Sequence, residues 1–178
     1  MKISTKTGDG GTCALMFGER VSKASPRVAA YGTVDEFCAA LGAARAKAQC
    51  PKLKGEILEV QNSLIKLMTE LATSPKNFGR LAEKNIGLLD DGDLAKIEAK
   101  ISEMEAEGDS FSGWKMPGET ELDAALNLAR AICRRAERET ARLNETEPLP
   151  RDFPLRYLNR LSDLAYLWAV RATRTPGK

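Results

Sequence analysis

The sequence of 178 residues contains no histidine. This absence excludes a Ser-His-Asp triad, a Cys-His pair, an HExxH zinc helix and a histidine general base. Any chemistry must therefore use Arg, Lys, Asp, Glu, backbone amides or a bound cofactor.

Long apolar runs and an excess of one charge are also absent. No apolar run approaches the roughly 18 residues of a membrane span, and the N-terminal sequence MKISTKTGDGG lacks the apolar core of a signal peptide. The 27 Lys and Arg against 25 Asp and Glu, a net charge of +2, give no reason to expect nucleic acid or a membrane as partner. We therefore expect a cytoplasmic protein, with one domain over residues 1–178.

Cysteine is scarce, and its spacing is uninformative. The four cysteines are Cys13, Cys38, Cys50 and Cys133. No two of them have CxxC spacing and no histidine could complete a ligand set, so we expect no zinc or other protein-held metal. The sequence predicts reduced thiols in apolar surroundings.

Helical periodicity dominates the chain after Pro26, whereas residues 1–25 show little of it. Five amphipathic stripes predict five helices. Their apolar positions fall within residues 34–44, 53–71, 94–104, 122–136 and 155–168. Residues 76–89 and 109–119 are predicted loops, and no strand pattern or internal repeat is found. The predicted fold is all-α, a five-helix up-and-down bundle over residues 26–173 with an ordered glycine-rich N-terminal segment.

The first candidate site is the segment Thr-Lys-Thr-Gly-Asp-Gly-Gly-Thr at residues 5–12. Its glycines let successive backbone amides converge on an anion, and Lys6 adds a positive charge. The segment matches neither a Walker A motif nor GxGxxG. A glycine-rich terminal turn without a ligand is the alternative.

The second candidate lies in the predicted helix over residues 120–147. Arg130, Arg134 and Glu137 have the spacing i, i+4 and i+7, which places them on one helix face beside the apolar stripe. Arginines next to a core are costly unless they are paired or bind an anion. An exposed face of charged residues, including Arg135 and Arg138, is the alternative.

The third candidate lies on the last predicted helix. Its polar residues are Asn159, Arg160, Ser162, Asp163 and Tyr166. A polar face this close to a core forms either a structural hydrogen-bond network or part of a binding site. Asp35 and Glu36, near the start of the first helix, are favoured there by the helix dipole, and Asp35 is also a candidate partner for an arginine.

Five segments together resemble the PduO-type corrinoid adenosyltransferases (ATP:cob(I)alamin adenosyltransferases). The segments are Thr5-Lys6-Thr7-Gly8-Asp9, Gly18-Glu19-Arg20-Val21 with Lys23, Arg27-Val28-Ala29-Ala30-Tyr31-Gly32-Thr33-Val34-Asp35-Glu36, Arg134-Arg135-Ala136-Glu137-Arg138 and Asn159-Arg160-Leu161-Ser162-Asp163. One such segment is weak evidence, but five in this order span nearly the whole chain and are specific.

The resemblance implies a homotrimeric five-helix bundle that binds ATP at the subunit interface, under residues 1–25, with a corrinoid beside it. Co(I) attacks the 5′ carbon of ATP, triphosphate leaves and adenosylcobalamin forms. Because Co(I) is the nucleophile, no protein base is needed, which agrees with the absence of histidine. A Co(II) reductase and a cobalamin-dependent enzyme are implied as further partners. The alternative is a non-catalytic relative that stores, delivers or senses the nucleotide or corrinoid.

The resemblance also implies roles for individual residues. The implied ATP-binding residues are Thr5, Lys6, Thr7, Gly8, Asp9, Lys23, Arg134, Arg135, Arg138 and Asn159. The implied catalytic residues are Arg134, Glu137, Asp35 and Arg130. Asp35 would pair with Arg130 across the interface, Glu137 would contact the nucleotide or hold the arginines, and Mg²⁺ would bridge the phosphates.

The sequence departs from the family pattern at several positions. These are Cys13 and Ala14 after the glycine loop, Cys38 after the Asp-Glu pair, Glu119 after Pro117-Gly118, and Asn127 in place of a family histidine. The family phenylalanine that keeps the lower axial ligand off the corrinoid aligns with Trp114, and Phe111 is near enough to take the same role. The match is therefore closer on the nucleotide side than on the corrinoid side.

Overall fold

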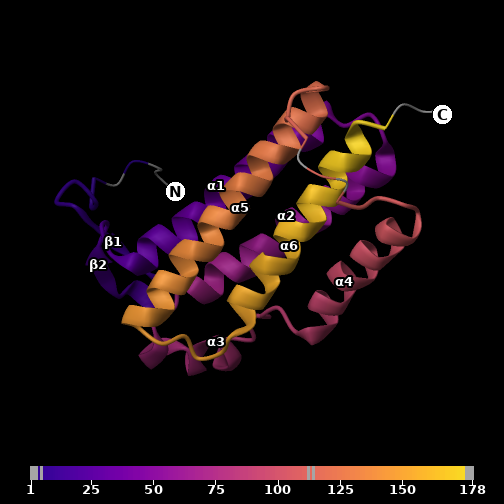
Figure 1. Cartoon of the computed structure of the whole chain (residues 1–178). Helices are drawn as coiled ribbons and strands as arrows, with labels where there is room; N and C mark the ends of the chain where they lie inside the picture. The colour runs from indigo at the N-terminus through magenta and orange to yellow at the C-terminus, as the bar shows by residue number, and fades with distance from the viewer. Residues whose placement is uncertain (1–3, 5, 112, 114, 175–178) are drawn as a thin grey trace.

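The chain is a helical bundle with a short hairpin at one end (Figure 1). The computed structural model describes residues 4, 6–111, 113 and 115–174. In chain order the elements are β1 (Thr12–Ala14), β2 (Arg20–Ser22), α1 (Pro26–Lys47), α2 (Pro51–Leu71), α3 (Gly79–Glu83), α4 (Asp91–Ala106), α5 (Glu121–Thr146) and α6 (Phe153–Ala172), with single 3-10 turns at Met16–Gly18 and Pro75–Asn77.

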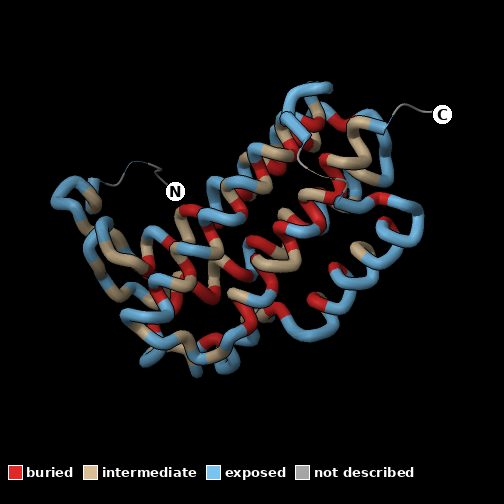
Figure 2. Tube along the Cα trace, viewed as in Figure 1, coloured by how far each residue is buried: buried red, intermediate tan, exposed pale blue. Residues whose placement is uncertain are grey.

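The long helices alternate in direction. α1, α4 and α6 run one way and α2 and α5 the other, while the hairpin and α3 lie at the end where α1 begins (Figure 1). α5 packs against α1 on one side and α6 on the other, α2 packs against α1, and α4 packs against α6. The buried residues form one cluster inside these five helices (Figure 2).

Local sequence explains where the helices begin. Pro26 occupies the first turn of α1, and the Ser25 hydroxyl accepts the Val28 N–H at 3.4 Å. The Thr120 hydroxyl accepts the Asp123 N–H at 2.9 Å at the start of α5, and Asp90 caps α4 in a capping box. Both residues are short polar side chains of the kind favoured at helix starts. No helix in residues 4–174, as far as they are described, combines the length and hydropathy needed to cross a bilayer.

The apolar stripes pack as their spacing predicts. Val34, Phe37 and Leu41 of α1 are almost fully buried, as are Leu64 and Leu67 of α2. Such leucine- and alanine-rich stripes bury one face of each helix and leave the opposite face to solvent. The mainly helical class is therefore confirmed.

Three details of the sequence prediction were wrong. The described residues contain six helices rather than five, because α3 lies in the predicted loop over residues 76–89. They also contain a two-stranded antiparallel sheet, in which Cys13 pairs with Val21. A five-residue helix and three-residue strands are too short to generate a recognisable period. Asp35 and Glu36 lie well beyond the first turn of α1, where the dipole effect has faded.

A buried arginine joins three helix ends. Arg27, with 3% of its side chain exposed, donates from one terminal nitrogen to the carbonyl oxygens of Leu71 at 2.7 Å and Thr73 at 2.8 Å. Its Nε donates to Glu147 at 3.0 Å. Arg27 therefore fastens the start of α1 to the ends of α2 and α5, next to the hairpin.

We predict that Arg27→Met lowers the free energy of unfolding by about 2–4 kcal/mol, because two buried carbonyls lose their donor. Urea unfolding at fixed protein concentration measures the change. Arg156→Met is the matched control: Arg156 is half-exposed and pairs with exposed Asp91 at 3.5 Å, so its loss should cost under about 0.5 kcal/mol. Equal effects of the two variants would contradict this account of Arg27.

Candidate active site

The N-terminal segment folds into tight turns ahead of β1. The Asp9 N–H donates to Lys6 O at 3.3 Å, and the Gly11 N–H donates to Gly8 O at 3.1 Å. Lys6 and Gly11 have positive φ angles of 58° and 75°. Because these two amides bond within the turns, the predicted amide nest is at most partly open to an anion. Thr5 lies outside the described residues.

Lys23, which directly follows β2, lies against this turn. A Cβ at Gly8 would lie 3.0 Å from Lys23 Nζ, so the ammonium group packs closely against the Gly8 backbone. Lys6, Lys23 and Asp9 are exposed. The structure thus brings together three predicted nucleotide-binding residues: Lys6, Gly8 and Lys23.

Two residues that the sequence prediction assigned no role hold this segment in place. Arg20 donates to Thr7 O at 2.6 Å and to the Thr12 hydroxyl at 2.5 Å. Glu19 accepts hydrogen bonds from Ser74 at 2.5 Å and Asn77 at 3.1 Å and pairs with Lys76 at 2.8 Å. The hydrogen bonds from Lys76 and Ser74 lower the pKa of Glu19. The hairpin is therefore tied to the connection between α2 and α3, which lies far away in sequence.

The second part of the site is a polar cluster on α5 and α6. Glu137 accepts from Arg134 at 2.8 Å, one turn earlier on α5, and from the side-chain amide of Asn159 on α6 at 3.0 Å. Arg160 donates to the other end of that amide, at Asn159 Oδ1, at 2.8 Å. The predicted grouping of Arg134, Glu137 and Asn159 is present in the structure, and Glu137 is the residue that links the other two.

The other predicted arginines of α5 differ from Arg134. Arg135 forms an ion pair with Glu36 of α1 and so faces a different helix. Arg138 is exposed and has no ion pair within the described part of the chain. Arg130 donates to Asn127 Oδ1 at 3.3 Å rather than pairing with Asp35, which is exposed on α1. One chain therefore does not bring Asp35 and Arg130 together.

Asp123 fixes the loop that precedes α5. Although buried, with 3% exposed, it accepts the backbone N–H groups of Gly118 at 2.7 Å and Glu119 at 3.2 Å. Its other oxygen accepts from Asn127 at 2.6 Å, and Asn127 in turn meets Arg130. This series of hydrogen bonds connects the loop backbone to Arg130, an arginine of the predicted site.

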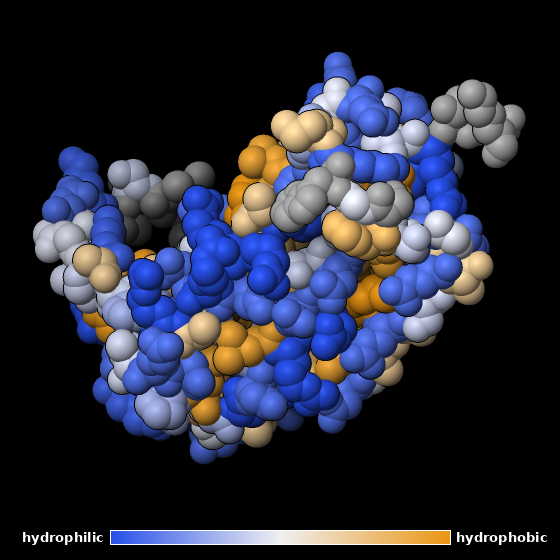
Figure 3. All heavy atoms as spheres, in the orientation of Figure 1, coloured by the Kyte–Doolittle hydropathy of each residue, from blue (hydrophilic) through white to orange (hydrophobic). Residues whose placement is uncertain are grey.

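An apolar groove of about 490 Å³ adjoins Arg130. Its walls come from α5, from the end of α6 with Thr173, and from the loop residues Phe111, Gly113, Lys115, Met116, Pro117 and Glu119. The Phe111 ring lies 6.2 Å from the Tyr166 ring of α6, and the side chains of Phe111 and Met116 are 66% and 85% exposed. Figure 3 shows apolar patches interrupting an otherwise hydrophilic face of the molecule. Exposed apolar side chains around a groove indicate a binding surface for a large apolar group. Trp114 lies outside the described residues.

The described residues show no hydrogen bond or ion pair between the N-terminal group (Lys6, Gly8 and Lys23) and the α5–α6 group (Arg134, Glu137 and Asn159). The hairpin extends from one end of the bundle, beyond the start of α1 (Figure 1). The described residues also contain no group of three or more Cys, Asp or Glu side chains placed to hold a metal ion.

Comparison with known proteins identifies the family. A family model described as cobalamin adenosyltransferase matches residues 3–172. The chain belongs to the cobalamin adenosyltransferase family. It is 36% identical to a corrinoid adenosyltransferase of Citrobacter freundii over 98% of this chain and 97% of that protein. It is 37% identical to the corrinoid adenosyltransferase PduO of the same organism and spans about half, 49%, of that longer protein.

Solved structures agree with the family assignment. A variant of the PduO-type ATP:corrinoid adenosyltransferase of Lactobacillus reuteri, complexed with cobalamin and ATP, matches with a TM-score of 0.85 and 31% sequence identity. The match covers 96% of this chain and 93% of that one. The resemblance inferred from the five sequence segments is therefore confirmed for the cobalamin adenosyltransferase family.

The four cysteines of this adenosyltransferase-family chain are free thiols in unlike surroundings. Cys133 of α5 is fully buried, Cys13 and Cys38 are half-buried and Cys50 is exposed, so the expectation of apolar surroundings was wrong for Cys50. Burial, with a smaller effect of Glu137, raises the pKa of the Cys133 thiol. Burial, followed by the contact with Cys13, raises the pKa of Tyr31 to about 12.

We predict that a thiol reagent modifies Cys50 rapidly at neutral pH and leaves Cys133 unmodified until the protein unfolds, because only an accessible thiolate reacts. Peptide mass mapping of the labelled protein identifies the modified residues, and Cys50→Ser is the control that should lose the rapid reaction. Rapid labelling of Cys133 would show that α5 is not packed as described.

Proposed function

We propose that this protein transfers the 5′-deoxyadenosyl group of ATP to the Co(I) centre of cobalamin or a related corrinoid. Co(I) supplies both electrons of the new Co–C bond, the bond between the 5′ carbon and its oxygen breaks, and triphosphate leaves with that electron pair. Membership of the cobalamin adenosyltransferase family supports this assignment, as do the cobalamin and ATP bound to the Lactobacillus reuteri neighbour.

One observation carries the proposal: a single face of α5 runs from an apolar groove to a polar, arginine-bearing cluster. Arg130 lines the groove, and Arg134 and Glu137 follow one and two turns later on the same face. A flat apolar ligand at the groove and a polyphosphate at the cluster would be neighbours. Aligning the two substrates and stabilising charge on the leaving triphosphate is the catalysis this reaction needs.

The phosphates of ATP are assigned to exposed cations, most of which have a charge that no ion pair among the described residues already neutralises. Three of these cations, Lys6, Lys23 and Arg138, are exposed and have no ion pair in the described part of the chain. The ion pair of Arg134 among the same residues is with Glu137. Thr5, Thr7, Gly8 and Asp9 complete the phosphate-binding segment within residues 1–25. Arg135 is neutralised by Glu36, so we assign it to packing α5 against α1. Mg²⁺ enters with ATP, because it is held mainly by phosphates and waters and needs no protein cage.

The corrinoid is assigned to the groove. Phe111 already lies on its wall, so it is the described residue best placed to shield the lower face of a corrin ring, and Trp114 remains the competing candidate. A separate reductase would supply Co(I), and a cobalamin-dependent enzyme would use the product.

We further propose a homotrimer in which each complete site combines residues of two copies of residues 1–178. Among the described residues no hydrogen bond or ion pair links the N-terminal group to the α5–α6 group, which supports a site shared between copies. Asp35 and Arg130 have no ion pair in the described residues, and Leu128 on α5 is 61% exposed, as expected of residues that a second copy covers.

Anaerobic mixing with MgATP and chemically reduced cobalamin tests the function. Loss of the Co(I) absorption with formation of a photolabile product supports the transferase. Binding of ATP or corrinoid without turnover would instead favour a relative that stores, delivers or senses the cofactor.

We predict that Arg134→Ala slows adenosylation roughly 30- to 1000-fold, corresponding to about 2–4 kcal/mol of lost transition-state stabilisation. Arg134→Lys should recover only part of the rate, because Lys lacks the planar fork. Arg142→Ala is the matched control, because Arg142 lies on the same helix and forms a similar ion pair with Glu139 at 3.2 Å. The side chain of Arg142 is 67% exposed. Wild-type turnover in Arg134→Ala would overturn its assignment.

We predict a mass in solution of about three times 19.4 kDa by light scattering at assay concentration. Asp35→Asn should weaken the trimer or raise the KM for corrinoid, because it removes the proposed partner of Arg130 in the neighbouring copy. Asp91→Asn, which alters an exposed acid whose ion pair among the described residues is with Arg156, should change neither property. A fully active monomer would contradict the proposed assembly.

A further inference from the structure

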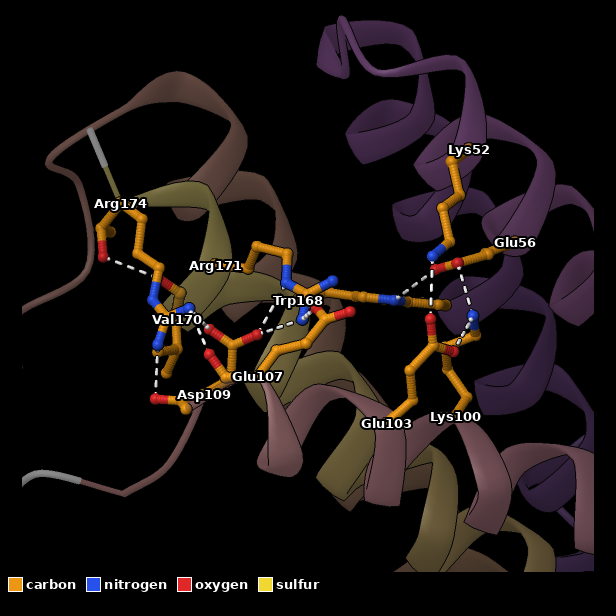
Figure 4. A network of polar contacts seen from close by, with 12 residues as sticks. Lys52, Glu56, Lys100, Glu103, Glu107, Asp109, Trp168, Val170, Arg171 and Arg174 are labelled. Atoms are coloured by element: carbon orange, nitrogen blue, oxygen red, sulfur yellow. Dashed lines mark hydrogen bonds and ion pairs between the residues drawn. The ribbon is translucent and has the colours of Figure 1, made fainter. Parts of the chain in front are cut away.

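Asp109 is a fully buried carboxylate at the start of the loop between α4 and α5. Its side chain is 0% exposed, and it follows Gly108, whose φ of 87° ends α4. Two arginines near the end of α6 meet it (Figure 4): Arg171 Nε donates to Oδ2 at 2.7 Å, and a terminal nitrogen of Arg174 lies 3.0 Å from Oδ1. A buried carboxylate is costly unless cations compensate it, so the three side chains form one unit.

The same arginines also hold the backbone on either side of Asp109. Arg174 donates to the carbonyl oxygens of Glu107, at 3.2 Å, and Gly108. Arg171 pairs with the Glu107 carboxylate at 2.5 Å, and the Asp109 N–H donates to Met104 O at 3.0 Å. Residues 107–109 are therefore fixed to the last turn of α6 by contacts from several directions (Figure 4).

This unit lies immediately before a wall of the groove. Phe111 follows Asp109 by two residues and contacts Tyr166, while Val170 and Thr173, which also line the groove, precede Arg171 and Arg174 directly. Phe111 is 66% exposed, so its own packing constrains it little. The ion-paired unit therefore restrains the loop at its α4 end, as Asp123 restrains it at its α5 end.

We propose that Asp109, held by Arg171 and Arg174, is a positioning residue that sets the Phe111 wall of the corrinoid groove. The proposal rests on the assignment of the corrinoid to this groove. The unit is remote from the nucleotide cluster, because Arg171 lies more than three helical turns beyond Asn159 on α6. Its loss should therefore affect one substrate and spare the other.

Arg174→Met tests the proposal, with Arg174→Lys as the conservative variant and Arg156→Met, in the first turn of α6, as the control. The measurements are the dissociation constant for cob(II)alamin by visible titration, the KM values for corrinoid and for ATP, and thermal unfolding. In Arg174→Met we expect corrinoid binding to weaken about tenfold or more, because small displacements of a positioning group have large effects. The KM for ATP should change less than about twofold, and Arg174→Lys should restore part of the corrinoid affinity.

Asp109→Asn removes the central charge and should weaken corrinoid binding further, but it risks unfolding because the site is buried. Arg174→Met avoids that risk, since it removes a half-exposed partner and leaves Asp109 paired with Arg171. Unchanged corrinoid binding in a folded Arg174→Met, or equal losses for ATP and corrinoid, would overturn the proposal.

The test separates this proposal from the function on which it rests. A wild-type protein that binds cob(II)alamin without turnover contradicts the transferase function, and the binding constants of the variants still decide the role of Asp109. A wild-type protein that binds no corrinoid overturns both.

Discussion

α5 is packed on two sides, against α1 and against α6, through small and fully buried residues that include Ala129, Cys133 and Ala136. Small side chains let helix backbones approach closely, and a close-packed interior tolerates little displacement. The outward face of the same helix carries Arg130, Arg134 and Glu137. The positions of the groove and of the polar cluster therefore both depend on how tightly α5 is held between its neighbours.

Charge is used in two distinct ways in this molecule. Apart from Asp123, which accepts hydrogen bonds from backbone amides and from Asn127, the buried ionic groups form ion pairs that fasten connections: Arg27 with Glu147, Glu70 with Arg151, and Asp109 with Arg171 and Arg174 at the end of α6. Each of these joins segments far apart in sequence, because a buried charge without a partner is too costly to keep. The cations near the proposed nucleotide, such as Lys6 and Arg138, are instead exposed and without ion pairs in the described residues. Their charge remains available to a ligand.

The sequence predicted those features that repeat or that lie close together along the chain. The five long helices follow from their apolar periods, and Thr120 and Asp90 follow from the preference of short polar side chains for helix starts. The pairing of Arg134 with Glu137 is local, so helical spacing was enough to suggest it. The hairpin and α3 were missed because three or five residues contain no full period.

Contacts between distant residues could not be predicted in the same way. Glu19 meets Ser74, and Asp109 meets Arg171, across intervals of more than fifty residues, and nothing in either local sequence indicates the partner. Asp35 shows a different error. An acidic residue is typical of the first turn of a helix, but α1 begins at Pro26, so Asp35 lies well inside it. Single-sequence reasoning thus offered candidates for the residues that carry the chemistry, but it gave little sign of the residues that hold those candidates in place.

The absence of histidine explains why the holding residues matter so much in this protein. An enzyme with a general base lowers its barrier partly through proton transfer, but attack by Co(I) on the 5′ carbon involves no such step. The protein's contribution is then the alignment of two substrates and the stabilisation of charge on the leaving group. Alignment is lost with displacements that would barely alter the fold. Under the proposed function, the buried ion pairs at the edges of the groove and of the hairpin would therefore contribute to alignment, beside the arginines that would face triphosphate.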